Sequence, residues 1–118
     1  MNNFKIILES KIEDFSHEVY RVCRGFPRDE LFITTAQLKR ASLSVLLNYA
    51  EGYARFRVNV QRNFLEIAYD SLQETKRLIK FSYVENFMTA ESYQKLYNNS
   101  DEIGKMLWTE IQNTNKNN

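Results

Sequence analysis

The sequence predicts an all-α protein, folded as an antiparallel up-down four-helix bundle. The chain has 118 residues, of which 43% are apolar and 14% aromatic, enough for one compact core. Three glycines and one proline are too few turn residues for an all-β fold of this length. Apolar residues instead recur at three- and four-residue intervals in four long stretches. We therefore expect a single domain over residues 1–112, built from four helices with short connections.

The first helix is expected over residues 4–24. Its apolar stripe consists of Leu8, Ile12, Phe15, Val19 and Val22. Gly25 suits the position just after a helix, and Pro27 disfavours helix at the residue before it. The pair marks the end of this helix clearly.

The second helix is expected over residues 30–53, because Asp29 and Glu30 place negative charge at a helix N-terminus. The stretch 53–59, YARFRVN, is the expected connection to a third helix over residues 60–83. Two adjacent apolar stripes mark this third helix: Phe64, Ile67, Leu78 and Phe81, and beside them Leu65, Ala68, Leu72 and Ile79.

The fourth helix is expected over residues 89–112, with Thr89 as its N-cap. Its stripe consists of Tyr93, Leu96, Ser100, Ile103, Leu107 and Ile111. The polar end NTNKNN, residues 113–118, predicts a disordered tail.

A row of polar residues runs along the second helix where a bundle helix is expected to be apolar. It consists of Gln37, Arg40, Ser44, Asn48 and Glu51, which fall within an arc of roughly 80°. Ser71 and Glu74 interrupt an apolar stripe of the third helix, so we expect an Arg40–Glu74 ion pair flanked by Ser44 and Ser71. Two interpretations stay open: a network that fixes helix register inside the bundle, or a functional pocket.

The opposite side of the second helix carries an apolar group. Leu46, Tyr49 and Tyr53 lie about 180° from the polar row. An apolar surface of this kind predicts a subunit interface.

Positive charge is concentrated in the middle of the chain although the net charge is only +1. In an up-down bundle, one end would carry Arg21, Arg24 and Arg28 together with Lys76, Arg77 and Lys80, and the other end Arg55, Arg57 and Arg62. These arginines are candidates for binding nucleic acid, since a positive cluster attracts phosphates. The alternative is that they are solvated charges with no partner.

The residues argue against catalysis and against a metal or cofactor. A di-iron-type bundle needs two Glu-x-x-His pairs, and His17 is the only histidine. His17 and Cys23 fall on opposite sides of the first helix, which disfavours a nucleophilic pair. A single cysteine favours a reducing compartment, and no apolar run predicts a membrane span or a signal peptide. We expect a cytoplasmic protein.

Five short motifs stand out along the chain: FP at 26–27, QLKRAS from 37, NYAEG at 48–52, FLEIA from 64 and EI-x-KML near the end. With these motifs the chain resembles the four-helix-bundle proteins encoded in intervening sequences of bacterial 23S ribosomal RNA genes. The positions of the family motif are Gln37, Arg40, Ser44, Asn48, Glu51, Gly52, Ser71 and Glu74. This resemblance implies a homo-oligomer, with a pentamer as the form associated with the family. Accessory proteins of diversity-generating retroelements are distantly similar, and they act with a reverse transcriptase and nucleic acid through a basic surface. The chain departs from the family pattern at 53–59.

Three functions follow as hypotheses. The first is a non-enzymatic homo-oligomer that binds RNA, DNA or a nucleoprotein partner through basic bundle ends. The second is a structural or protein-interaction module without nucleic-acid binding. The third and least favoured is an enzyme whose pocket uses Arg40, Glu51 and Glu74. No membrane or small-molecule partner is expected.

Overall fold

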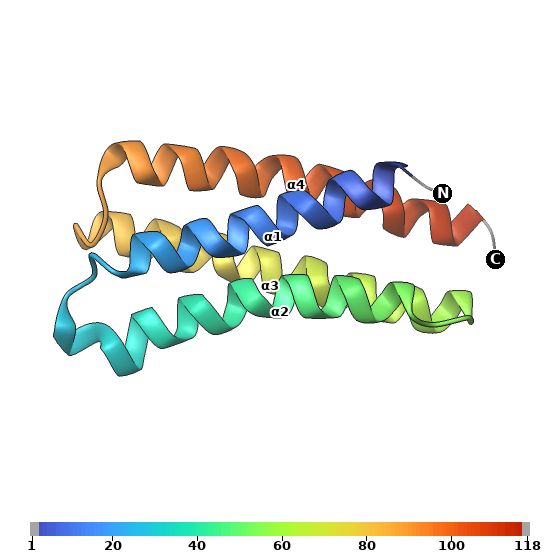
Figure 1. The fold of residues 1–118 in the computed structure, drawn as a ribbon, viewed down its shortest axis with the longest axis horizontal. Helices are drawn as coiled ribbons and strands as arrows, with labels where there is room; N and C mark the ends of the chain where they lie inside the picture. The colour runs from blue at the N-terminus through green and yellow to red at the C-terminus, as the bar shows by residue number, and fades with distance from the viewer. Residues whose placement is uncertain (1–2, 117–118) are drawn as a thin grey trace.

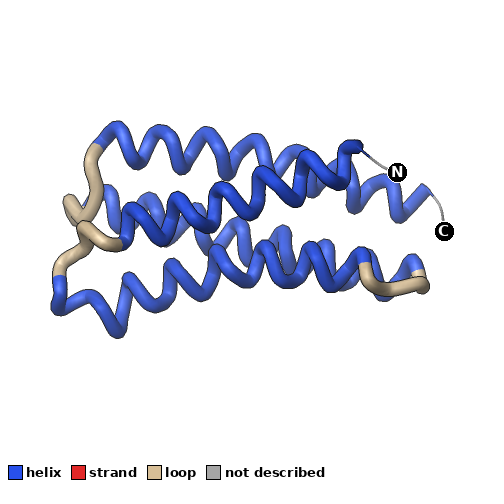
Figure 2. Tube along the Cα trace, viewed as in Figure 1, coloured by secondary structure: helices blue, strands red, loops and turns tan. Residues whose placement is uncertain are grey.

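The structure, a computed structural model, describes residues 3–116 and confirms the antiparallel up-down four-helix bundle (Figure 1). Its helices are α1 (Asn3–Cys23), α2 (Ala36–Tyr53), α3 (Val58–Val84) and α4 (Ala90–Lys116). Figure 2 shows that short loops join the helices, and residues 3–116 contain no strand. The start of α1, the end of α4 and the α2–α3 turn share one end of the bundle.

The core runs along the bundle axis and draws on all four helices. Its largest fully buried side chains are Leu8, Ile12, Phe15 and Val19 of α1, Leu38, Val45 and Tyr49 of α2, Leu72 and Ile79 of α3, and Leu96, Ile103 and Leu107 of α4. Within each helix they are three, four or seven residues apart, in agreement with the predicted helical period. Burying each such side chain stabilises the fold by about 1.5–3 kcal/mol, so no helix is independent of the others.

The predicted second helix does not begin as a regular α-helix. A 3₁₀ turn, η1 (Arg28–Glu30), leads into a π turn, η2 (Leu31–Thr35), and α-helical winding starts only at Ala36. The wide turn allows the consecutive residues Thr34 and Thr35 both to be buried. The Thr34 hydroxyl donates to a Glu30 carboxylate oxygen at 2.6 Å, which ties this turn to its own start.

The other connections lie close to the predicted positions. α3 begins at Val58, two residues earlier than expected. Between α3 and α4, Asn86 adopts a left-handed conformation, φ 65°, which asparagine tolerates better than most residues. The Thr89 hydroxyl accepts a hydrogen bond from the Ser92 N–H at 3.1 Å and confirms the predicted N-cap.

The C-terminal helix is longer than predicted, because α4 continues to Lys116 through residues assigned to a disordered tail. Thr114 is buried, and Arg62 of α3 donates to its hydroxyl at 3.1 Å and to its carbonyl oxygen at 3.3 Å. This guanidinium satisfies one of the carbonyls that a helix end leaves without a partner. Residues 117 and 118 of the predicted tail lie outside the described residues.

Candidate functional site

The polar row of α2 faces α3 and joins the two helices by hydrogen bonds. The Ser44 and Ser71 hydroxyl oxygens are 2.8 Å apart. The Asn48 amide donates to the Ser44 carbonyl at 2.9 Å and to the Ser44 hydroxyl at 3.0 Å. Ser44 and Ser71, which were expected to flank an ion pair, therefore bond to each other, and this bond holds the antiparallel helices in one register.

The predicted Arg40–Glu74 ion pair is wrong, because Gln37 stands between the two charges. The Gln37 amide donates to the Glu74 carboxylate at 3.1 Å. The Gln37 side-chain oxygen in turn accepts a hydrogen bond from Arg40 at 2.8 Å. Arg40 is exposed and lies one turn after Gln37 on the same helix, so its charge stays in water. A glutamine bridge replaces the charge pair.

Glu51 and Gly52 complete the row near the α2–α3 turn. Glu51 forms an ion pair with Arg55, four residues later. Gly52 is buried, and a Cβ there would lie 3.3 Å from Phe64 Cβ and 3.4 Å from the Gln61 carbonyl oxygen. The glycine thus permits the close approach of α2 and α3 at this end.

The row lies at the edge of the bundle and not inside it. Gln37 and Arg40 are exposed, while Ser44, Asn48 and Glu51 are half-buried. Water therefore reaches much of the network, and its carboxylates do not converge on a closed pocket. The expectation of a network inside the bundle needs this correction.

Exposed apolar side chains flank the polar row. Leu43 and Leu47 of α2 are 37% and 58% exposed, and Ile67 and Phe81 of α3 are 39% and 52% exposed. We call these four residues the α2/α3 face. Because Ser44 is paired with Ser71 in antiparallel helices, Leu47 and Ile67 lie at the same level along the bundle. Scattered apolar residues are ordinary on a protein surface, but a group beside a shared polar network is typical of an interaction surface.

The π turn extends this exposed apolar character toward one end of the bundle. Leu31, Phe32 and Ile33 are consecutive and all exposed, Phe32 to 89%. Their burial pattern is the reverse of that of Thr34 and Thr35, which point inward. Sequence periodicity could not reveal this inversion, because a π turn changes the angular step between residues.

The predicted interface of Leu46, Tyr49 and Tyr53 is wrong. Tyr49 is fully buried, and Leu46 and Tyr53 are half-buried against the core. The prediction failed because the polar row faces α3 and not the bundle axis, so the opposite side of α2 is turned toward α1. Lys5 of α1 accordingly lies over the Tyr53 ring, 4.2 Å from its centroid.

A buried carboxylate that sequence analysis overlooked lies beside these tyrosines. The Tyr49 hydroxyl donates to Glu110 at 3.2 Å, and Glu110 is 7% exposed. Burial, together with the neighbouring Tyr53, raises the pKa of Tyr49 far above its usual range. Burial and the nearby Glu110 carboxylate also raise the pKa of Tyr53. The available signal was the spacing of Glu110, three residues after Leu107 in the core stripe of α4.

Several arginines of the predicted basic clusters form ion pairs or hydrogen bonds within the fold. Arg21 pairs with Glu18, and Arg55 pairs with Glu51 while lying over the Phe64 ring. Arg62 is half-buried and donates hydrogen bonds to Thr114 and, at 3.2 Å, to the side-chain oxygen of Asn59. Among the arginines proposed to bind nucleic acid, Arg24, Arg28 and Arg57 are exposed and form no ion pair with another described residue.

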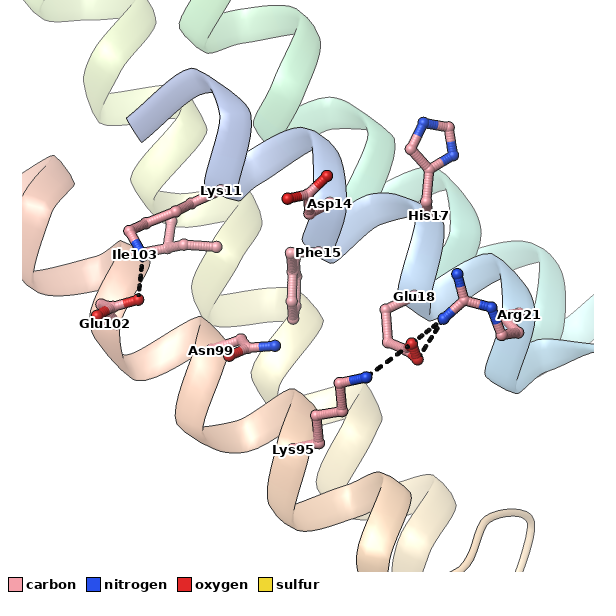
Figure 3. A pocket seen from close by; sticks show the side chains of 10 residues that line it. All are labelled: Lys11, Asp14, Phe15, His17, Glu18, Arg21, Lys95, Asn99, Glu102 and Ile103. Atoms are coloured by element: carbon pink, nitrogen blue, oxygen red, sulfur yellow. Dashed lines mark hydrogen bonds and ion pairs between the residues drawn. The ribbon is translucent and has the colours of Figure 1, made fainter. Parts of the chain in front are cut away.

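A polar groove of about 570 Å³ separates α1 from α4, and Figure 3 shows its side chains. Its charges largely neutralise one another: Lys11 lies 2.9 Å from Glu102, and Lys95 lies 3.4 Å from Glu18. His17 is among the ten residues that line the groove, and none of the contacts drawn in Figure 3 involves it. No catalytic arrangement emerges from these residues.

Metal binding and thiol chemistry find no support in the described part of the chain. Residues 3–116 contain no group of three His, Cys, Asp or Glu side chains placed to hold a metal ion. Cys23 is buried, and burial raises the pKa of its thiol to about 11, which keeps it protonated. None of the described helices combines the length and hydropathy needed to cross a bilayer.

The fold, with a polar row that links α2 to α3, defines the class of the protein: a small antiparallel four-helix bundle. The family model for the 23S rRNA-intervening sequence protein matches residues 5–109, and the chain belongs to that family. No curated protein matches the chain. A solved structure from Bacteroides thetaiotaomicron, described as a protein with unknown function from the S23 ribosomal protein family, is similar in fold. It is 22% identical, with a TM-score of 0.86, over 92% of this chain and 98% of that one.

Proposed function

We propose that this chain is a non-enzymatic bundle that associates with copies of itself through the α2/α3 face. The observation that carries the proposal is the exposure of four large apolar side chains around the hydrogen-bonded row of α2 and α3. Subunit interfaces combine an apolar centre with polar groups of this kind. The pocket of Arg40, Glu51 and Glu74 is not assembled, since Glu51 pairs with Arg55 and Glu74 with Gln37.

A ring of five copies is the assembly that we propose, on the basis of the family resemblance. Rings require a heterologous contact, so the α2/α3 face would meet a different surface of the next copy. We further propose that the protein works in the reducing cytoplasm, where its single buried Cys23 stays a free thiol.

Light scattering coupled to size-exclusion chromatography tests self-association. Five chains of 14.1 kDa give about 70 kDa, and the double variant Leu47→Asp/Ile67→Asp is expected to lower the mass toward that of a single chain. Ile7→Asp is the matched control, because Ile7 is 49% exposed on α1 and lies outside the face. A 14 kDa wild-type mass at micromolar concentration, or an unchanged mass in the double variant, contradicts the proposal.

Nucleic-acid binding at the bundle ends is the second candidate function. It is favoured by Arg24, Arg28 and Arg57, which are exposed and form no ion pair with another described residue. A ring would repeat each positive charge and strengthen the field that attracts phosphates. Ring assembly and nucleic-acid binding are separable, since they use different residues.

A salt series with RNA and DNA fragments tests this second function. We expect binding that weakens steeply as salt rises, and that is lost in the triple variant Arg24→Gln/Arg28→Gln/Arg57→Gln. The absence of binding at low salt would instead favour the alternative of a structural or protein-interaction module. A nucleoprotein partner would be detected by adding protein-bound RNA in the same assay.

A further inference from the structure

A line of aromatic rings follows the groove between α3 and α4. Tyr93, Tyr97 and Trp108 share one side of α4, and Tyr83 and Tyr69 lie opposite them on α3. The Tyr83 and Tyr93 rings are stacked with centroids 4.3 Å apart, and Tyr97 follows at 5.8 Å from Tyr93. The Tyr69 and Trp108 centroids are 5.9 Å apart. We call these five residues the aromatic track, which extends over about 22 Å from Tyr93 to Trp108.

The rings of the aromatic track are partly buried and partly exposed to solvent. Trp108 is 54% and Tyr97 37% exposed, while Tyr69, Tyr83 and Tyr93 are half-buried. A groove of about 490 Å³ lies beside Trp108, and Gly104 is part of its wall. The rings are therefore fixed in place while part of their surface remains accessible. This favours binding, because little side-chain conformational entropy is lost when a ligand binds.

Positive charges are interleaved with the rings. Lys76 Nζ lies 5.2 Å from the Tyr97 ring centroid and 3.5 Å from Asp101. Lys105 Nζ lies 3.5 Å from the other oxygen of Asp101. One carboxylate is thus shared by two lysines, which leaves a net positive charge at the centre of the track.

Two further cations lie on α3, the helix that carries Lys76. Arg77 and Lys80 are exposed on α3, and neither forms an ion pair with another residue in the range 3–116. Glu66 and Asp70 are also exposed on α3, three residues before and one residue after Tyr69, and they offset part of this charge. Cations still outnumber carboxylates on this side of the bundle.

Aromatic rings alternating with cations match the chemistry of a single strand. Unpaired bases stack on aromatic side chains, and cations track the phosphates. A duplex would present only its phosphates and would leave the rings unused. We propose that the aromatic track binds single-stranded nucleic acid, with bases stacked on Tyr97 and Trp108 and phosphates contacting Lys76 and Lys105. The proposal rests on the second candidate function and moves the contact from the bundle ends to one side.

Intrinsic fluorescence gives a direct test, because Trp108 is the only tryptophan of the chain. The wild-type protein is titrated at low salt with unstructured RNA or DNA of about twelve nucleotides, within the site sizes of single-strand-binding folds. Stacking on Trp108 should quench its fluorescence. In anisotropy measurements with a labelled strand, Trp108→Ala and Tyr97→Ala should each raise Kd about 5- to 100-fold. Trp108→Phe should restore most of the affinity.

Two controls separate stacking from other causes. Phe56→Ala removes an equally accessible ring outside the track, since Phe56 is fully exposed in the α2–α3 turn, and should leave Kd unchanged. A strand that lacks its bases loses the stacking on both Tyr97 and Trp108, so it should bind the wild type at least as weakly as the intact strand binds Trp108→Ala. Circular dichroism checks that every variant keeps its helix content.

Three results would overturn the proposal. An unchanged Kd in Trp108→Ala and Tyr97→Ala, with binding lost in the triple arginine variant, would place the contact at the bundle ends and keep the second candidate function. If neither RNA nor DNA binds at low salt, both the aromatic-track proposal and the second candidate function are overturned. A lowered molar mass of Trp108→Ala with unchanged Kd would assign the track to a protein contact.

Discussion

The hydroxyl of Tyr49 donates a hydrogen bond to the carboxylate of Glu110 at 3.2 Å, linking residues 61 positions apart in the sequence. Tyr49 belongs to α2 and Glu110 to α4, helices that each pack against α1 and α3. The bond therefore spans the bundle between non-adjacent helices. Both residues are buried, so the pair depends on the bundle being correctly assembled.

Tyr49→Phe should lower the free energy of unfolding by about 1–3 kcal/mol, because the buried carboxylate loses a donor. Urea denaturation at neutral pH measures the change. Tyr97→Phe removes a hydroxyl from an exposed ring and is the control, expected to change stability by less than about 0.5 kcal/mol. Equal effects of the two substitutions would show that the Tyr49–Glu110 bond contributes nothing.

Stability should fall above pH 9 because of Cys23. Burial raises the pKa of this thiol from 9.0 to about 11, with Lys39 opposing part of the shift. The folded state thus retains a proton that the unfolded chain loses, so stability is complete below pH 9 and declines as pH rises toward 11. Between pH 8 and 10 the loss from Cys23 should reach about 1 kcal/mol, and Cys23→Ala should remove this part of the decline. The part that remains near pH 10 comes from Tyr49 and Tyr53, whose pKa values burial also raises. A decline of the same size in Cys23→Ala would rule out the thiol as its cause.

Arg62→Ala should loosen the last turns of α4. The Arg62 guanidinium donates hydrogen bonds to the Thr114 hydroxyl and carbonyl oxygens. Losing these bonds should lower the stability of this end of the bundle by about 1–2 kcal/mol. Hydrogen exchange should show faster exchange of amides in 111–116. Arg57→Ala, which removes an exposed arginine from the same end, should not change it. Unaltered exchange in Arg62→Ala would mean that α4 does not depend on this contact.

Gly52→Ala should destabilise the bundle by about 1–2 kcal/mol, even though alanine favours helix. Its Cβ would come within 3.4 Å of the Phe64 Cβ and the Gln61 carbonyl, both fixed by the backbone of α3. Gly104→Ala is the matched control: its Cβ would lie 3.5 Å from Leu72, an ordinary contact, so it should stabilise by about 0.5–1 kcal/mol. Thermal unfolding of both variants measures the difference, and a stabilised Gly52→Ala would contradict the close approach of α2 and α3.

The positions of the helices along the chain could be predicted from local sequence signals. The rotation of each helix about its own axis could not. The three- and four-residue period located all four helices, and Thr89 was recognisable as an N-cap. On α2, however, apolar residues flank the polar row on both sides, so the pattern was compatible with more than one rotation about the helix axis. Tyr49 consequently proved to be buried and Leu47 exposed, the reverse of what an interface through Tyr49 requires.

Contacts between side chains were harder still to predict. Ser44 and Ser71 lie close together, as their expected place beside one ion pair required, because short side chains at one level have few alternatives. Arg40 did not meet Glu74, since a long side chain can choose among several partners and the nearby Gln37 was one of them. The aromatic track likewise depends on the facing of α3 and α4, which no single helix encodes.

The shared position of the two described chain ends has a practical consequence. α1 begins and α4 ends beside the α2–α3 turn, while the π turn bearing Phe32 lies at the far end (Figure 1). An affinity tag or fluorescent reporter fused to either terminus would accordingly emerge on the Phe56 side. Immobilising the protein by such a tag would leave the Phe32 end pointing into solution, the orientation suited to probing that end with soluble ligands.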